Sequence, residues 1–489
     1  MSSSTLKRLT AALLCSVMVG ASLISCSSDA PANNGTNDTT AADTTAETAA
    51  ETADPSLPDV EISDYNGKEF HVFAPSWSHY KTSFFADGET GDVMNDAVFK
   101  RRTQTEEYLN LKLTHTIQGD VMKLYDTIRP IVMAGEDTYQ LILTHFYHCV
   151  AAILSDGLLY DQNKIAAIDF SKPYWNHLVN ENLNVDGHQY YSSSDMMMSE
   201  TIVMLFNKSI VTNYKMEDPY ELVRSGDWTI DKMLAMIETA TKDLNGDSVI
   251  DHVNDQLGLT GEYWRYSAFL GASDIFLAEK DASAGLRLSL NGERTVKLTE
   301  KFDKLINGTK STFTWKVNAT DICAMDTGRV LFQMEELANF FKYRETDVDF
   351  GILPLPKYDS AQDQHYAIEL SGFIGVPATV GDPEMAGKVL EMLAYFSMDT
   401  TQPVYYEQVL GEKLSRDADS KEMLNLIFDS IVVDPGRVWF GNGSAMGNLF
   451  YTIHNGIMQG EQFASWYAKH EEAANKEIAA FMESVRKIG

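Results

Sequence analysis

The sequence predicts an α/β protein whose globular part folds as two domains. Short apolar strands, such as 69–74 and 111–116, alternate with helical segments, such as 96–108 and 121–133. Strands that alternate with helices in this way are typical of α/β units with a mainly parallel sheet. About 430 of the 489 residues belong to the globular part, which is too many for a single hydrophobic core.

The same alternation continues along the rest of the chain. Further strands are expected at 139–144, 330–334, 348–356 and 372–377. A helix is expected to begin after Thr229, because apolar residues follow at helical spacing and Thr is a good N-cap. The last helix carries six large apolar residues at helical spacing, namely Phe463, Trp466, Tyr467, Ile478, Phe481 and Met482.

The N-terminus is predicted to be an address rather than part of the fold. Lys7 and Arg8 precede an apolar stretch that is too short and too interrupted to span a bilayer. It ends in the segment 23–26 (LISC), which resembles the bacterial lipobox, in which the Cys receives diacylglycerol. We therefore expect a lipoprotein signal peptide at 1–25 and lipidation of Cys26. The alternative is an ordinary secretory signal with a chance Cys.

The segment 26–58 contains no aromatic residue and no Lys or Arg, and is rich in Ser, Thr, Ala, Asn and Asp. Such a composition cannot bury enough apolar surface to offset its chain entropy, so we expect a disordered tether. The protein is thus expected at the cell membrane, lipid-anchored on the extracytoplasmic face.

Charge and cysteine content exclude several classes of protein. The net charge of −31 argues against a nucleic acid partner. In the globular part only Cys149 and Cys323 remain, in apolar contexts far apart, so two buried thiols are favoured over a disulfide. His145 and His148 form an HxxH pair after a strand, but no His or Cys cluster supplies a third metal ligand.

An ordered set of segments resembles the extracellular solute-binding proteins of ABC importers, of the maltose-binding type (family 1). The set comprises 225–229 (SGDWT), 241–247 (TKDLNGD), 328–332 (GRVLF), 349–357 (DFGILPLPK) and 371–376 (SGFIGV). No single motif is diagnostic, but the order of the segments covers most of the chain.

The resemblance implies a two-lobed, periplasmic-binding-protein-like fold of type II, in which crossing hinge segments join the lobes at a ligand cleft. The N-lobe would be 59–195 plus 352–400, and the C-lobe 196–351 plus 401–489. The implied protein is a monomeric binding protein and not an enzyme. It would pass a small-molecule ligand, a sugar or oligosaccharide, to ABC permease subunits. Two alternatives remain, a surface-anchored glycan-active hydrolase and a lipoprotein that binds glycans or peptides without a transporter.

Sugar binding needs aromatic faces, and four aromatic residues are candidates. Trp77 follows the first strand, where ligands bind in open α/β sheets. Tyr263 and Trp264 are further candidates, as is Trp439 in the Gly-rich loop 435–443, where the family places a cleft aromatic. The alternative for each tryptophan is a place in the core, which is favoured for three others, Trp228, Trp315 and Trp466.

Two acidic residues complete the predicted ligand site. Glu335 follows a strand where the family presents cleft residues, although it could equally be a solvated carboxylate at a helix N-terminus. Asp195 lies near the expected first crossing, where it would bond a ligand hydroxyl or only cap a turn.

The segment 243–251 resembles the calcium loop of EF-hands. Asp243, Asn245, Asp247 and Asp251 fall at ligand positions 1, 3, 5 and 9. Position 6 is Ser248 instead of Gly, and position 12 is an Asn, so the bidentate carboxylate is out of register. A structural Ca²⁺ is the only cofactor that the sequence raises, and an acidic turn that ends a helix is the alternative.

Overall fold

The computed structural model describes residues 56–76, 84–117, 119–145, 148–283, 285–316, 323–343, 346–414, 417–441 and 444–489. These residues belong to one compact unit, Asp54–Gly489. The expected signal peptide, Cys26 and the tether up to residue 55 lie outside the described residues.

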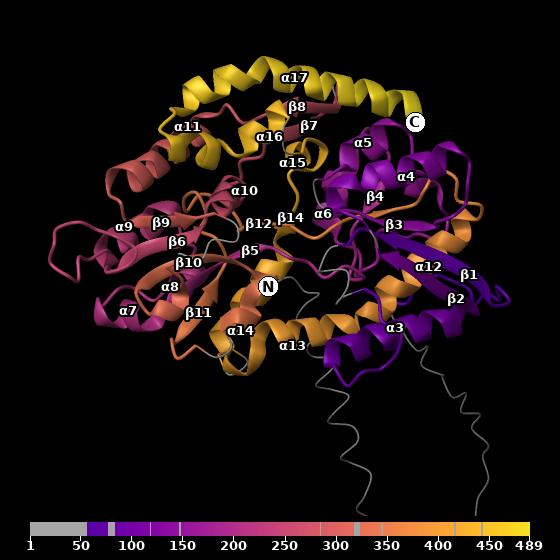
Figure 1. Cartoon of the computed structure of the whole chain (residues 1–489), viewed down its shortest axis with the longest axis horizontal. Helices are drawn as coiled ribbons and strands as arrows, with labels where there is room; N and C mark the ends of the chain where they lie inside the picture. The colour runs from indigo at the N-terminus through magenta and orange to yellow at the C-terminus, as the bar shows by residue number, and fades with distance from the viewer. Residues whose placement is uncertain are drawn as a thin grey trace, which may run out of the picture. The chain divides into compact units, whose positions relative to one another are not determined.

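The first of two five-stranded sheets is built mainly by the N-terminal third of the chain (Figure 1). Its order is β2-β1-β3-β13-β4, with strands β1 (Lys68–Ala74), β2 (Leu111–Ile117), β3 (Leu141–Leu143), β4 (Tyr191–Ser192) and β13 (Ile374–Gly375). The strands β1, β2 and β3 run parallel, as expected, whereas β13 is antiparallel to both β3 and β4.

The second sheet has the order β11-β5-β10-β6-β9. Its strands are β5 (Ile202–Asn207), β6 (Leu257–Glu262), β9 (Thr312–Trp315), β10 (Val330–Glu336) and β11 (Phe350–Leu353). β6 is parallel to both β9 and β10, but β5 is antiparallel to β10 and β11. The expectation of mainly parallel sheets is therefore only half right, because β5 and β13 each enter their sheet from the other one and run in the reverse direction.

Helices cover the faces of both sheets. They are α3 (Val93–Leu109), α4 (Leu124–Met133), α5 (Val150–Ser155), α6 (His177–Leu183), α7 (Lys208–Asn213), α8 (Pro219–Ser225), α9 (Ile230–Ala240), α10 (Ala268–Ala272), α11 (Glu293–Asp303), α12 (Pro383–Ser397), α13 (Thr401–Leu414), α14 (Ala418–Asp429), α15 (Pro435–Trp439), α16 (Ala445–Phe450) and α17 (Phe463–Ile488). The predicted cap of α9 is confirmed, because the Thr229 hydroxyl accepts a hydrogen bond from the Lys232 N–H. None of the helices in the described ranges is long and apolar enough to cross a membrane.

Three crossing segments connect the two sheets. The first crossing, 193–201, joins β4 to β5, and the second, 354–373, joins β11 to β13 and contains β12 (Ala367–Ile368). The third crossing, 430–434, contains β14 (Ile431–Val432), which pairs in parallel with β12. Figure 1 shows β12 and β14 between the two large sheets. The second sheet extends to Leu353, two residues beyond the expected C-lobe limit at 351.

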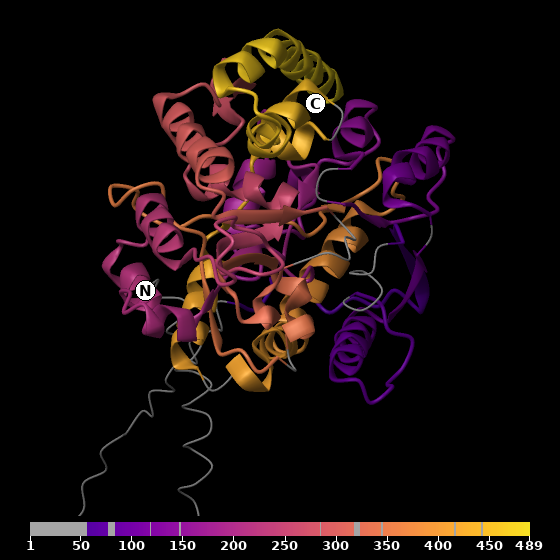
Figure 2. The ribbon, with the colours of Figure 1, turned by 60° about the vertical axis from the view of Figure 1, so that its left-hand side comes forward.

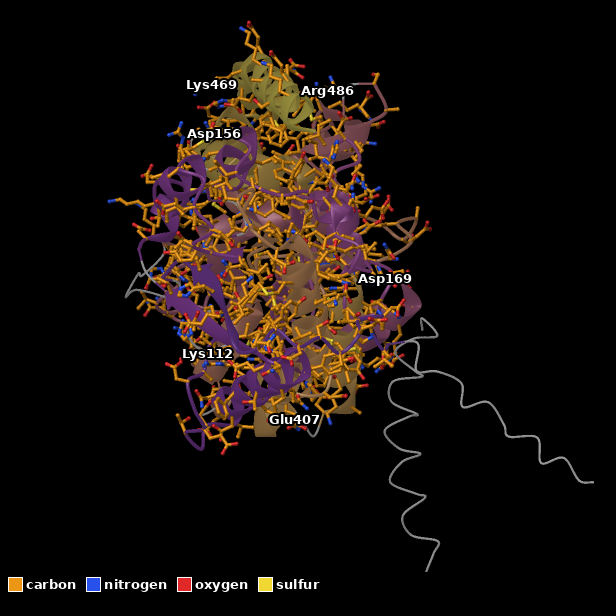
Figure 3. All side chains as sticks on the ribbon, turned by 90° about the vertical axis from the view of Figure 1, so that its right-hand side faces the viewer. Lys112, Asp156, Asp169, Glu407, Lys469 and Arg486 are labelled. Carbon is orange, nitrogen blue, oxygen red and sulfur yellow. The ribbon has the colours of Figure 1, made fainter. Side chains whose placement is uncertain are left out.

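The C-terminal helix α17 runs along the outside of the body (Figures 1 and 2, yellow). It packs on α16 and on β8 (Gly285–Leu288), and its C-terminal end contacts α5, the helix that follows β3. Arg486, labelled in Figure 3, lies near that end and pairs with Asp186 at 3.3 Å. Cys149 and Cys323 are both thiols, as expected, but only Cys323 is buried, whereas Cys149 is half-buried.

Candidate functional site

The candidate site begins where two neighbouring parallel strands of the second sheet end. β6 ends at Glu262 and continues into a 3₁₀ turn, η3 (Tyr263–Ser267), while β10 ends at Glu336. Ligands of open α/β sheets bind outside the carboxyl ends of strands. The side chains of Glu262, Tyr263, Trp264 and Glu336 are therefore in the expected place for a binding site.

Two aromatic side chains at this edge are partly exposed. Tyr263 packs on His454 of the π-helical turn η7 (Thr452–Gly456), with 4.0 Å between the ring centroids. The indole Nε1 of Trp264 donates to Glu262 Oε2 at 2.8 Å, which fixes the orientation of its ring. Both sequence candidates thus sit in a position to offer an aromatic face, and the hydrogen bond holds one of them in place.

A buried arginine that the sequence analysis missed organises the carboxylates of the site. Arg265 is 3% exposed and lies 2.7 Å from Glu335, 3.2 Å from Glu336 and 3.5 Å from Glu262. Three carboxylates surround one guanidinium, so the cluster carries excess negative charge. Burial raises the pKa of Glu336 to about 6, and the charge of Arg265 only partly opposes the effect. Such carboxylates are good acceptors for ligand hydroxyl groups.

Glu335 lies inside β10 and is 3% exposed, so the alternative of a solvated carboxylate at a helix N-terminus is wrong. Besides its ion pair with Arg265, its Oε2 accepts from the Tyr343 hydroxyl at 2.8 Å, and its Oε1 accepts from Asn339 Nδ2 at 3.0 Å. Protein groups occupy both oxygens, whereas Glu262 and Glu336 keep side-chain exposures of 16% and 23%. Glu335 therefore supports the cluster, and the other two carboxylates are more accessible.

A second group of polar side chains lies in the segment after β3 of the first sheet. His145 and His148 lie there with their ring centroids 4.7 Å apart. Burial, reinforced by the charge of Arg437, lowers the pKa of His148 to about 4. Among the residues that the structure describes, no three His, Cys, Asp or Glu side chains are arranged to hold a metal ion.

Arg437 on α15 lies between the segment after β3 and the segment after β6. Its guanidinium lies 3.8 Å from the ring centroid of Phe450 and donates from Nη1 to the Tyr451 hydroxyl at 3.3 Å. Tyr451 in turn contacts His454, with 5.5 Å between ring centroids. We call the five residues His148, Arg437, Tyr451, His454 and Tyr263 the polar–aromatic row. This row runs from the segment after β3 to the segment after β6, and so spans the two sheets.

Trp439 does not lie in a loop, because residues Pro435–Trp439 form the helix α15. The Asp434 carboxylate caps this helix by accepting from the Gly436 N–H at 2.8 Å, and Pro435 occupies the first turn. Trp439 is 1% exposed and packs between Tyr191 and Phe481, at centroid distances of 6.0 and 5.2 Å. These contacts favour the alternative, a place in the core.

Four further tryptophans and Asp195 were assigned positions from the sequence. Trp228, Trp315 and Trp466 are 0%, 8% and 7% exposed, which confirms their predicted core positions. Trp77 lies outside the described residues. Asp195 belongs to the first crossing, where its N–H donates to the Tyr174 carbonyl at 2.8 Å and its carbonyl accepts from Gln402 Nε2 at 2.9 Å.

The acidic loop 243–251 folds around its own side chains. The Asp243 carboxylate accepts from the N–H groups of Gly246 and Ser248, and Asp247 accepts from Val249. The out-of-register Asp255 is buried and closes the loop, accepting from Leu244 and from Asp251, each at 2.8 Å. Asn245 bonds Asp247 within the same loop. The loop is thus ordered by turns, and calcium binding stays a prediction.

No protein-family model matches this chain, and no curated protein matches it either. Solved structures do match. The galacto-N-biose-/lacto-N-biose I-binding protein of a Bifidobacterium longum ABC transporter, in complex with lacto-N-biose, has a TM-score of 0.60 at 13% identity, over 86% of this chain and 99% of that one. A Thermotoga lettingae ABC transporter solute-binding protein bound with α-D-tagatose has a TM-score of 0.51 at 12% identity, over 85% and 100%.

A third match is an ABC substrate-binding protein from Listeria monocytogenes in complex with cycloalternan, with a TM-score of 0.50 at 12% identity, over 86% and 98% of the two chains. All three are binding proteins rather than enzymes. At these identities the likeness concerns the fold. The two mixed sheets, the three crossings between them and these matches establish that the chain has the two-lobed fold of ABC transporter solute-binding proteins.

Proposed function

We propose that this protein is the substrate-binding lipoprotein of an ABC importer and captures a sugar or oligosaccharide in the cleft between its two lobes. The observation that carries the proposal is the site itself. Partly exposed aromatic rings and carboxylates meet at the carboxyl ends of β6 and β10, in a fold whose matched relatives are solute-binding proteins. It is proposed to act at the extracytoplasmic face of the membrane, anchored through Cys26.

The chemistry of the site fits a sugar. The faces of Tyr263 and Trp264 can cover the C–H surface of a pyranose ring, and Glu262 and Glu336 can accept hydrogen bonds from its hydroxyl groups. The matched structures are complexes with α-D-tagatose, cycloalternan and lacto-N-biose. Binding would close the lobes, because the ligand contacts both of them only in the closed state and shifts the population by that difference in affinity.

A thermal-shift screen of neutral mono-, di- and oligosaccharides tests the proposal. A ligand at 100 times its dissociation constant should stabilise the folded protein by about 2.7 kcal/mol. Calorimetry on the best ligand then compares two variants from the same lobe. Tyr263→Ala should weaken binding by about 2 kcal/mol, as expected for an aromatic anchor. Tyr214→Ala, at the end of α7, should leave the affinity unchanged.

Three outcomes would contradict the proposal. New reducing ends after prolonged incubation with oligosaccharides would support the hydrolase instead. Full affinity in a well-folded Tyr263→Ala variant would show that the binding site lies elsewhere. Binding without any permease that requires the protein for uptake would support the glycan-binding lipoprotein that acts outside a transporter.

A further inference from the structure

The three crossing segments meet at one buried carboxylate, Glu369. The side chain is 2% exposed and lies directly after β12 in the second crossing. Its Oε1 accepts backbone N–H groups from Glu200 at 3.1 Å, from Leu370 at 3.0 Å and from Ser371 at 2.8 Å. Glu200 belongs to the first crossing, so this carboxylate joins two segments that are far apart in the sequence.

Backbone hydrogen bonds complete the junction. The Leu370 N–H donates back to the Glu200 carbonyl at 2.8 Å, so the first and second crossings exchange two hydrogen bonds. The Glu369 N–H donates to the Val432 carbonyl of the third crossing at 2.9 Å. A single residue therefore contacts the first crossing with its side chain and the third with its backbone.

Backbone groups, and not a cation, hold the carboxyl group of Glu369. Within the described ranges, no lysine, arginine or histidine forms an ion pair with it, and backbone N–H groups supply the compensation. Burial raises the pKa of the carboxyl group, and the bonds from Ser371, Ser199 and Glu200 oppose the increase. A buried carboxylate held in this way demands a fixed geometry, because each lost N–H partner leaves an oxygen unsatisfied.

We infer that Glu369 is a positioning residue for lobe movement, and that it ties the first and second crossings together so that the two lobes open and close as rigid bodies about one junction. The inference rests on the proposed function, in which opening and closing carry the ligand. Hinges are a few residues at element ends that absorb the change in backbone angles. A carboxylate that fixes three backbone groups at that point limits which residues can rotate.

Glu391 offers a matched control. It is also fully buried, and it accepts hydrogen bonds from Trp175 Nε1 at 2.9 Å, from the Asp169 N–H at 2.8 Å and from the Tyr174 hydroxyl. These partners lie in 169–175, which precedes β4, and Glu391 itself lies on α12, so the bonds stay on the side of the first sheet. Replacing Glu391 by Gln should change stability without affecting the crossings, since none of its hydrogen-bond partners belongs to them.

The experiment is hydrogen–deuterium exchange with mass spectrometry on the full chain without ligand. It compares wild type with Glu369→Gln and Glu391→Gln. In Glu369→Gln we expect peptides covering 198–202 and 369–373 to exchange about tenfold faster, since the three N–H groups lose a charged acceptor. Peptides covering η3 and α15 should also exchange faster, because the lobes open more often. In Glu391→Gln these four segments should exchange at the wild-type rate even if the melting temperature falls.

Glu369→Asp is the second variant, which keeps the charge but shortens its reach, and it should show a smaller increase at the same peptides. Unchanged exchange in 198–202 and 369–373 in both Glu369 variants would overturn the inference, as would an equal increase in Glu391→Gln. Because the measurement needs no ligand, it is independent of the glycan screen. Faster exchange in Glu369→Gln, together with no glycan binding in the screen, would support the role of Glu369 and contradict the proposed sugar ligand. Glycan binding together with unchanged exchange would contradict the role of Glu369 alone.

Discussion

Replacing Trp439 by Ala distinguishes core packing from ligand stacking. The indole is 1% exposed and stacks on Phe481 of α17 at 5.2 Å, while Tyr191 of β4 lies 6.0 Å away on another side. The residue therefore ties together α15, the C-terminal helix and an edge strand of the first sheet. Truncation would leave a cavity among elements that are anchored elsewhere and cannot collapse into it.

The expected cost follows from the burial. A fully buried Trp replaced by Ala costs about 3–5 kcal/mol, which includes the two aromatic contacts. The entropy of unfolding is about 2.1 cal/mol/K per residue, or roughly 0.9 kcal/mol/K for the roughly 430 residues of Asp54–Gly489. For cooperative unfolding of this body, the melting temperature should fall by roughly 3–6 °C.

The assay is calorimetric melting of the ligand-free protein, followed by titration with the best ligand of the screen. Trp264→Ala is the matched variant, because Trp264 is partly exposed and makes one side-chain hydrogen bond. It should cost about 1 kcal/mol or less in stability and should weaken ligand binding. An unchanged melting temperature for Trp439→Ala, combined with lost binding, would refute our assignment of Trp439 to the core and restore it as a ligand contact.

Three further predictions concern the anchor, the acidic loop and a buried acid. Cys26→Ser should abolish incorporation of labelled lipid, and unchanged labelling would remove the anchor. We propose that millimolar calcium raises the melting temperature by ordering the loop at Asp247, and that Asp247→Ala abolishes the rise; a wild-type protein that ignores calcium would dispose of the site. The pKa of Glu391 is raised from 4.5 to about 7 by burial, so wild-type stability should fall by about 3 kcal/mol relative to Glu391→Gln as the pH rises from about 4.5 to 7. Parallel pH profiles of the two proteins in denaturant melts would contradict this.

Much of the fold could be predicted because local pattern and tertiary structure agree. The strand expected at 69–74 appears as β1, because its apolar side chains lie on the covered faces of the sheet. Thr229 caps α9 through its hydroxyl group, as expected from its residue type. The strand at 372–377 was expected and appears as β13, but the antiparallel direction of β5 and β13 was not predicted, because it depends on the crossings and leaves no local signature.

The site was predicted less well, for two physical reasons. Pro435 and Gly436 together are typical of a turn, but Asp434 at the cap position and Pro435 at the first helical position are also a helix start, and that combination determines the structure. Arg265 was missed because its role depends on β6 and β10 being neighbours, although 65 or more residues separate them in sequence.

Glu335 and Glu369 show why acidic residues of this chain cannot be assigned roles from composition. Both are almost fully buried, and both lie at or next to short apolar strands, so the sequence pattern around them is alike. Their partners differ. Glu335 faces a guanidinium and belongs to a charge cluster beside the aromatic rings, whereas Glu369 faces two backbone N–H groups of its own segment and one of the first crossing. A carboxylate that pairs with a cation leaves the neighbouring carboxylates accessible. A carboxyl group that is bound by backbone N–H groups instead fixes the path of the chain. The topology, which decides which of these partners is present, therefore separates the carboxylate of the charge cluster from the carboxyl group that joins the crossings.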